Sequence, residues 1–295
     1  MPTTIPTVTS STRPGSPSAG DAYFETDTKN YIIYDGANWR GYVSDGLSGW
    51  SGSNTYSMNF DGTDDYLTGS AVTPTAQQGT ISAWIKTTNT GNSVVLSQSD
   101  NTVADQCLFL RLQGANAAFG FVTGSTISIK RGSTTINDGN WHHIVWWSDG
   151  TNWKIYVDGG DEGTLTSVTG SAQGLWLGDL TSSNNLAIGM RVRNTTDLVY
   201  NGNIDEVAIW DSTLSASQIT NIYKGESNGG SGGTNGTPGN LLSFSPKAWW
   251  RMGDGAEANS GTTIYDMSSF SNNMTIVNAT SGTNTAGAVY QADTP

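Results

Sequence analysis

Short apolar runs separated by polar turn clusters constrain the fold of this 295-residue chain more than any other feature. Each run is rich in β-branched and aromatic residues and is bounded by Gly, Asn, Asp, Ser or Thr. The main runs are YSMNF (56–60), TISAWIK (80–86), SVVLSQ (93–98), CLFLRL (107–112), AAFGFVT (117–123), HHIVWW (142–147), WKIYVDG (153–159), LAIGMRV (186–192) and IDEVAIW (204–210). Many short strands at this spacing are typical of two packed antiparallel sheets rather than of a parallel α/β fold.

Side-chain alternation within the runs indicates which faces are buried. Ile81, Ala83 and Ile85 share one face of TISAWIK, as a half-buried strand requires. The run 141–147 is apolar or aromatic on both faces, so it is either central and covered on both sides or exposes aromatics at a groove. The polar segment 148–152 that follows it predicts a hairpin loop in which Gly150 takes a positive φ.

One helix is predicted over 215–224. Ser215 and Gln218 form a capping box, Leu214 and Ile219 supply a hydrophobic staple, and Gly225 ends the helix. The fold class is therefore all-β: a two-sheet antiparallel jelly roll with one short helix.

Composition divides the chain into four predicted parts. Residues 51–224 form the jelly roll, and residues 225–240, rich in Gly and Ser, form a flexible linker. Residues 1–50 begin with a Pro/Ser/Thr arm and continue as a β-hairpin module. Residues 241–295 form a small C-terminal β segment that is too short to be stable alone, so it must dock on the jelly roll, on another subunit or on another protein.

Charge and apolar length exclude two classes of partner. The formal net charge is −12, with 13 Lys+Arg against 25 Asp+Glu, so nucleic acid is an improbable ligand because phosphate binding needs clustered cations. No apolar run reaches the roughly 18–20 residues of a membrane helix.

The first residues lack a basic start and an apolar stretch, so no Sec signal peptide is expected. The single cysteine, Cys107, fits a small buried hydrophobe.

Several segments together resemble laminin-G-like domains of the concanavalin A-like lectin/glucanase superfamily. They are SMNFDGTDDYL, TISAWIK, DGNWHHIVWWSDGTNWKIYVDG and GNIDEVAIWDSTLSASQITNIY, in that order, and they cover roughly residues 55–224. The resemblance implies a jelly roll with a lectin-like surface.

The flanking segments resemble parts of tailed-phage virion proteins, notably those of marine cyanobacterial phages. STRPGSPSAGDAYFETDTKNYIIYDGANWRGY is similar to small hairpin modules, and SPKAWWRMGDG with YDMSSFSNNMTIVN is similar to tails that follow such jelly rolls. The second segment also resembles the first strand of a truncated further repeat. The resemblance implies a protein of the virion surface, a capsid decoration or a short fibre, with other virion proteins as partners.

Catalysis is not expected. Glucanases of this superfamily carry paired carboxylates on a strand of the form E-x-D-x-x-E. Here Asn203 replaces the first Glu, and simple alternation places Asp205 and Glu206 on opposite faces. His142 and His143 also alternate between faces, and the simpler interpretation is a structural histidine with satisfied hydrogen bonds.

A structural Ca²⁺ is the more serious chemical candidate. Related jelly rolls place Ca²⁺ against an Asp at the start of the late strand, which here is Asp205. Alternation puts Asp205 on the face of Val207 and Ile209, and a buried carboxylate needs a partner. The predicted ligands are Asp205 together with the loop acids Asp61, Asp64 and Asp65. The alternative is that Asp205 accepts backbone hydrogen bonds and the loop acids form a solvated turn.

Aromatic residues are the other candidate contacts. Glycan binding uses exposed aromatics, and the candidate set is Trp146, Trp153 and Trp176, although most Trp side chains are buried. Attachment or self-association is expected through Tyr23, Phe24, Tyr31, Tyr34, Trp39, Trp249 and Trp250, and the resemblance to phage appendages implies a trimer. The alternative is a monomer in which both flanking segments fold back on the jelly roll.

The sequence thus predicts a non-enzymatic virion surface protein that displays a lectin-like jelly roll. The alternative is a carbohydrate-binding adhesin that recognises host surface glycans.

Overall fold

The computed structural model divides the chain into two compact units, residues 1–52 and residues 53–295. It describes residues 6–18, 21–25, 30–34, 39–43, 54–73, 76–254, 262–277, 290–291 and 293–295. Among these described residues, no helix is long and apolar enough to cross a membrane.

The first unit contains one four-stranded sheet in the order β1-β2-β3-β4. β1 (Thr7–Val8) pairs in parallel with β2 (Ala22–Glu25), and β3 (Asn30–Tyr34) and β4 (Trp39–Val43) continue the sheet antiparallel. A single 3₁₀ turn, η1 (Ser10–Thr12), follows β1. The segment expected to be an arm thus contributes one short strand to this sheet.

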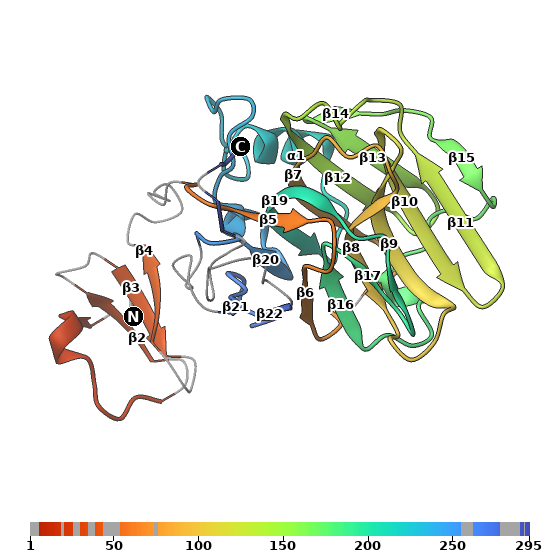
Figure 1. Ribbon diagram of the computed structural model, residues 1–295. Coiled ribbons are helices and arrows are strands. Elements are labelled where there is room, and N and C mark those ends of the chain that lie inside the picture. The colour runs from red at the N-terminus through yellow and green to blue at the C-terminus, as the bar shows by residue number, and fades with distance from the viewer. Residues whose placement is uncertain are drawn as a thin grey trace. The chain divides into compact units, whose positions relative to one another are not determined.

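The second unit is a sandwich of two large sheets (Figure 1). The nine-stranded sheet has the order β15 (Thr166–Thr169), β11 (Thr126–Arg131), β10 (Asn116–Thr123), β9 (Gln106–Gln113), β8 (Ser93–Ser99), β16 (Asn185–Ile188), β6 (Tyr66–Gly69), β22 (Met274–Val277) and β21 (Thr263–Ile264). The eight-stranded sheet has the order β14 (Gly160–Asp161), β13 (Trp153–Val157), β12 (Trp141–Ser148), β7 (Gly79–Lys86), β19 (Asn201–Trp210), β5 (Ser57–Asp61) and β23 (Tyr290–Gln291), with β20 (Ala248–Trp250) paired to β19. The predicted all-β jelly-roll class is confirmed.

The main core lies between the two sheets. Leu108, Leu110 and Leu112 of β9 face Ile81, Ile85 and Trp146 of the other sheet within one apolar cluster. The predicted alternation of β7 holds, since Ile81, Ala83 and Ile85 belong to this cluster. Two further turns, η2 (Leu177–Asp179) and the small hairpin of β17 (Arg191–Val192) with β18 (Thr196–Asp197), complete the loops around it.

A second apolar layer covers the outer face of the eight-stranded sheet. It contains Val145, Ala208 and Trp210 from the strands, Ile219 and Ile222 from α1 (Ala216–Tyr223), and Leu241 and Phe244 from η3 (Leu241–Phe244). The capping box of Ser215 and Gln218 forms as predicted. β12 is therefore central and covered on both faces, because the main core lies on one side and this layer on the other.

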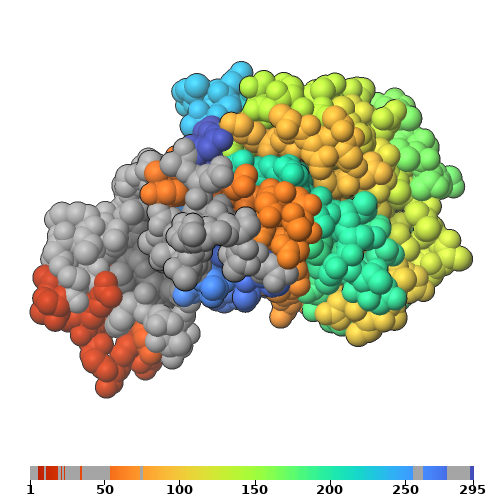
Figure 2. Space-filling view, viewed as in Figure 1, coloured from red at the N-terminus to blue at the C-terminus, as the bar shows by residue number. Residues whose placement is uncertain are grey.

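The C-terminal segment belongs to the sandwich of the same chain. β20 pairs with β19, β22 pairs with β6, and β23 pairs with β5. Figure 2 shows the blue surface of this segment directly beside the orange surface of residues 54–73. Trp249 and Trp250 are both buried, and their indole N–H groups donate to the Glu206 carboxylate and to the Asn272 carbonyl at 2.8 Å, respectively. The sequence left open whether these two assembly residues dock on their own jelly roll or on another protein, and the structure shows them packed in their own jelly roll.

The Gly-rich segment 225–240 is held against α1 by hydrogen bonds. Backbone N–H groups of Gly236 and Thr237 donate to the Tyr223 carbonyl, and the Asn221 side chain donates to the Ser227 and Gly230 carbonyls. Its Gly/Ser composition predicted a flexible linker. The docking against α1 could not be recognised from the sequence, because Gly and Ser form no apolar pattern.

Candidate functional site

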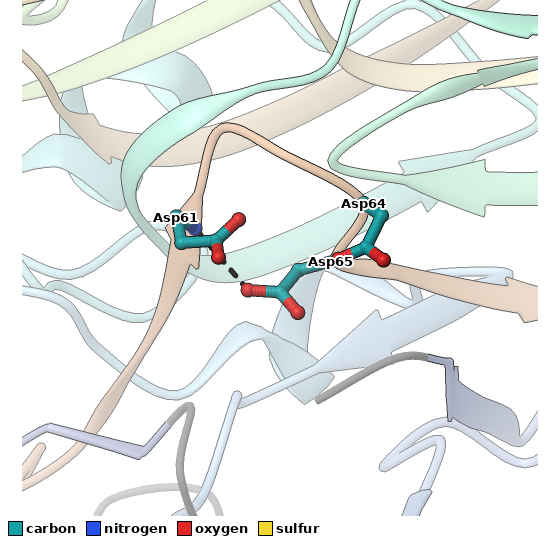
Figure 3. A group of neighbouring side chains, drawn as sticks. All are labelled: Asp61, Asp64 and Asp65. Carbon is teal, nitrogen blue, oxygen red and sulfur yellow. Dashed lines mark hydrogen bonds between the residues drawn. The ribbon is translucent and has the colours of Figure 1, made fainter. Parts of the chain in front are cut away.

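The turn between β5 and β6 gathers three carboxylates. The carboxylate oxygens of Asp61, Asp64 and Asp65 all lie within 4.8 Å of one another. In Figure 3 the Asp65 carboxylate points toward the backbone of Asp61, whose N–H donates to it at 3.2 Å. Burial raises the pKa of Asp65, and the negative charges of Asp61 and Asp64 raise it further. A cation bound here would therefore relieve like-charge repulsion.

Asp205 lies outside this cluster and on a different face from the one predicted. It pairs with Trp84, whereas Ile204 and Ile209 pair with Ile85 and Ile81, which face the main core. A β-bulge between Asp205 and Ala208 inserts an extra residue, so Asp205 points to the outer face while Val207 points to the core. The prediction that Asp205 shares a face with Val207 was wrong, because it assumed unbroken alternation.

The same bulge brings the Glu206 side chain to the outer face as well. Glu206 adopts φ 47°, a left-handed conformation uncommon outside glycine. Its carboxylate accepts hydrogen bonds from Trp249 Nε1 and, at 3.0 Å, from Arg251 Nε. The prediction that Asp205 and Glu206 lie on opposite faces was therefore also wrong.

Both carboxylates are sealed from solvent beneath the C-terminal segment. Asp205 accepts hydrogen bonds from Asn54 Nδ2 at 2.9 Å and from the Glu206 N–H at 2.8 Å. Burial raises the pKa of Asp205 well above its usual range, and the adjacent Glu206 charge raises it further. Burial also raises the pKa of Glu206, although Arg251 opposes this shift. The pair is built into the packing of β19 against β20, where a substrate has no access.

We expect Asp205→Asn to raise the melting temperature at pH 7. An acid whose pKa is raised by folding contributes stability that is fully present below its unfolded pKa and is lost as pH rises through the folded pKa. The new amide carries no charge and keeps a carbonyl oxygen for the Glu206 N–H. Its NH2 group can donate to the Asn54 side-chain oxygen, which is buried without a partner among the described residues, once the Asn54 amide rotates. The gain, about 2–4 °C for each kcal/mol recovered, should shrink as pH falls toward 4. Exposed Asp105→Asn is the control; an equal gain at both pH values would contradict this account.

The three tryptophans proposed as sugar platforms lie in the main core. Trp146, Trp153 and Trp176 are all buried in the main core, and the rings of Trp153 and Trp176 pack against Phe119. Trp146 Nε1 donates to the Ala118 carbonyl of the opposite sheet at 3.1 Å. A sugar cannot stack on them, because their faces are already packed between the sheets.

The two adjacent histidines do point in different directions, as predicted. His142 bonds through Nδ1 to Asp158 at 2.8 Å and through Nε2 to Asp138 at 3.2 Å, and these carboxylates raise its pKa. His143 is fully buried against the rings of Trp84 and Tyr223, and burial lowers its pKa to about 4. Its ring nitrogens have no hydrogen-bond partner among the described residues, so the expectation of a histidine with satisfied hydrogen bonds holds for His142 and is wrong for His143.

The aromatic residues expected to mediate attachment are described only in part. Tyr23 and Tyr34 are half-buried within the first unit. The side chains of Phe24, Tyr31 and Trp39 lie outside the described residues, although their backbones pair in register with Tyr31, Tyr42 and Tyr34 respectively.

Four arginines on the outer face of the nine-stranded sheet were not predicted as a site. They are Arg111, Arg131, Arg191 and Arg193. Alternation in the run CLFLRL could have predicted the position of Arg111, because it places Cys107, Phe109 and Arg111 on the face opposite the three leucines. Only the fold shows that Arg131 and the β17–β18 hairpin reach the same face.

Comparison with known families identifies one match. The laminin G-like family described as "Concanavalin A-like lectin/glucanases superfamily" matches residues 61–220, more than half of the chain. No curated protein matches the sequence.

Comparison with solved structures finds similar chains at low sequence identity. A Bacteroides ovatus protein proposed to bind carbohydrate is 16% identical, with a TM-score of 0.51 over 88% of this chain and 68% of that chain. The Ruminococcus gnavus IT-sialidase CBM40, solved with α2,3-sialyllactose, is 16% identical, with a TM-score of 0.46 over 58% of this chain and 99% of that chain. The LG4-5 domains of mouse laminin α1 are 17% identical, with a TM-score of 0.42 over 55% of this chain and 44% of that chain. At these identities the likeness concerns the fold alone, and the Bacteroides ovatus structure supports it.

Proposed function

This chain belongs to the concanavalin A-like lectin/glucanase superfamily, and from this membership we propose that it is a non-enzymatic carbohydrate-binding protein. The observation that favours binding over hydrolysis is the position of Asp205 and Glu206. Glycosidases need two carboxyl groups that reach the scissile bond from opposite sides. Here the two lie side by side beneath β20, and Arg251 and Trp249 occupy the Glu206 oxygens.

We expect the full chain to bind a subset of sugars on a glycan array and to leave them intact. Mass spectrometry of the bound sugars after prolonged incubation checks both points in one experiment. Asp205→Asn and Glu206→Gln variants should bind as the unmodified chain does, because neither side chain reaches solvent. Release of shortened sugars that disappears in these variants would contradict the proposal, and so would an array without any bound sugar at millimolar concentration.

A structural Ca²⁺ held by Asp61, Asp64 and Asp65 is the second part of the proposal. Hard carboxylate oxygens suit this ion, and the like charges around buried Asp65 favour it. Asp205 is omitted, because it lies outside the cluster. The ion would fix the β5–β6 turn.

We expect millimolar Ca²⁺ to raise the melting temperature relative to excess chelator. Binding to the folded state alone adds about 2.7 kcal/mol at a hundredfold excess over Kd. Asp61→Asn with Asp64→Asn should abolish the difference, whereas Asp205→Asn should leave it intact. Superimposable melting curves with chelator and with Ca²⁺ would rule out a structural ion.

The virion surface remains a second candidate setting for this function. The division of the chain into a small N-terminal unit and a separate sandwich supports it, because such a unit could attach a displayed domain. An attachment unit would join other virion proteins, and the resemblance to phage appendages favours a trimer. Labelling this protein on purified particles tests the location, and sizing full-length protein beside a form that starts near Gly46 tests the role of the N-terminal unit. A shortened form that still joins particles as a monomer would overturn it.

A further inference from the structure

The outer face of the nine-stranded sheet carries an arginine on each side of β10. Arg111 of β9 and Arg131 of β11 both pair with Ala118 of β10, so the two arginines flank one small residue. Directly opposed residues in antiparallel strands project to the same face. Cys107, Phe109 and Ala118 form an apolar cluster on this face, separate from the main core. The arginines therefore project away from the sandwich interior.

A glycine allows the guanidinium groups to gather over one aromatic ring. Phe109 pairs with Gly120, where a Cβ would lie only 2.2 Å from the ring, so the ring lies across the glycine backbone. The Arg111 and Arg191 guanidinium carbons lie 5.4 and 5.2 Å from the centre of this ring. Cation–π attraction holds both charges at the same place despite their mutual repulsion.

Arg111 is buried there without a hydrogen bond to an anion among the described residues, although the Asp197 charge lies near enough to act on it. It is only 7% exposed, and its side-chain hydrogen bond goes to the neutral Gln113 amide oxygen. Its Nε is buried without a hydrogen-bond partner among the described residues. Burial and the nearby Arg191 charge lower its pKa to about 10. Arginines are rarely buried unless an anion pairs with them, so an anion bound at this site would stabilise the buried guanidinium.

The β17–β18 hairpin adds two cations and a single carboxylate. Asp197 accepts from Arg191 Nε at 2.6 Å and from an Arg193 terminal nitrogen at 3.4 Å. Arg193 Nε is also buried without a partner in the described part of the chain. Ser97 of β8 and Arg193 anchor the hairpin by donating to the carbonyls of Met190 and Ala104. Three arginines thus share one carboxylate, which leaves the cluster positive within a chain of net charge −12.

We propose that Arg111, Arg191 and Arg193 form a site for the acidic group of a charged sugar, a carboxylate or a sulfate ester. The proposal rests on the carbohydrate-binding function above and names its ligand class. A guanidinium pairs with two oxygens of such groups in a planar, bidentate geometry. The negative charge of the whole chain repels long acidic polymers at a distance, so recognition depends on the local pairing rather than on long-range steering. The acidic group would give Arg111 a counter-charge of its own, because the Asp197 carboxylate is already bonded to Arg191 and Arg193.

Calorimetry with matched sugars on the full chain tests the site. The acidic probes are the methyl glycosides of glucuronic acid and N-acetylneuraminic acid, together with glucose 6-sulfate; methyl glucoside is the neutral counterpart, and inorganic sulfate is the ion alone. We expect at least one acidic sugar to bind tenfold or more tightly than methyl glucoside. Arg111→Met should lower that affinity at least tenfold, whereas Lys154→Gln, which removes a cation from the other sheet, should leave it unchanged.

The melting temperature of the sugar-free protein separates a binding role from a structural one. If Arg111 awaits an anion, Arg111→Met removes an uncompensated buried charge and keeps or raises the melting temperature. A large fall would show that Arg111 stabilises the fold, and Arg111→Lys then tests binding with the charge retained. The proposal is overturned if acidic sugars bind no better than methyl glucoside, if Arg111→Met binds normally, or if only sulfate binds. Neutral sugars that bind without acidic preference would leave the carbohydrate-binding function standing, whereas an array with no bound sugar would remove both.

Discussion

We expect Arg251→Met to lower the free energy of unfolding by about 3–5 kcal/mol at pH 7, the cost of leaving one member of a buried ion pair without its partner. Arg251 and Glu206 are 3% and 2% exposed, and the Arg251 Nε donates to the Glu206 carboxylate at 3.0 Å. This contact joins β19 to the C-terminal segment that covers it. Its loss leaves the Glu206 charge next to Asp205 with no cation beside it.

The effect depends on pH in a direction fixed by the pKa of Glu206. Without Arg251 that pKa rises further above its unfolded value, so the deficit grows as pH rises from 4 to 7. Glu206→Gln together with Arg251→Met removes both charges and keeps an acceptor for the Trp249 N–H. This double variant should recover most of the loss, since replacing a buried pair with uncharged groups is often neutral. Urea denaturation at pH 4 and pH 7 measures all three proteins, and a loss below 1 kcal/mol for Arg251→Met would mean that the pair does not hold the segment.

Trp146→Ala also destabilises the fold by about 3–5 kcal/mol, because it opens a large cavity in the middle of the sandwich. Trp146 is fully buried, and its indole N–H donates to the Ala118 carbonyl at 3.1 Å, which links the eight-stranded sheet to the nine-stranded one. Its neighbour Trp147 lies on the outer face and is partly exposed. Trp147→Ala should therefore cost less in the same urea titration.

A second measurement separates this packing role from sugar recognition. Trp146→Phe keeps an aromatic ring and most of the volume but loses the N–H donor. It should bind sugars as the unmodified chain does, with only a moderate loss of stability. A selective loss of sugar binding in Trp146→Phe, with stability unchanged, would contradict the placement of this side chain in the core.

Local features of the sequence predicted the architecture well, because their causes are themselves local. Alternation in TISAWIK predicted the core face of β7, and the capping box of Ser215 and Gln218 predicted the start of α1. Turn residues around Gly150 predicted the hairpin between β12 and β13. Each of these patterns acts over a few residues, so neighbouring side chains alone specify it.

The candidate sites depended on contacts that no local pattern contains. The bulge at Glu206 moves two carboxylates to one face, and it arises where β19 pairs with β7 and β20. Trp249 and Trp250 became core residues because β20 docks on β19, about 40 residues away along the chain. Arg111 and Arg191 meet over Phe109 only because the β17–β18 hairpin folds across the nine-stranded sheet. The sequence by itself determined the longer strands of the main runs, the helix and the family, because these follow from short-range periodicity and motif order. It missed strands such as β11 and β15, which carry little apolar pattern. Only the tertiary structure decided which charges are buried together, because side chains distant in sequence meet through strand pairing.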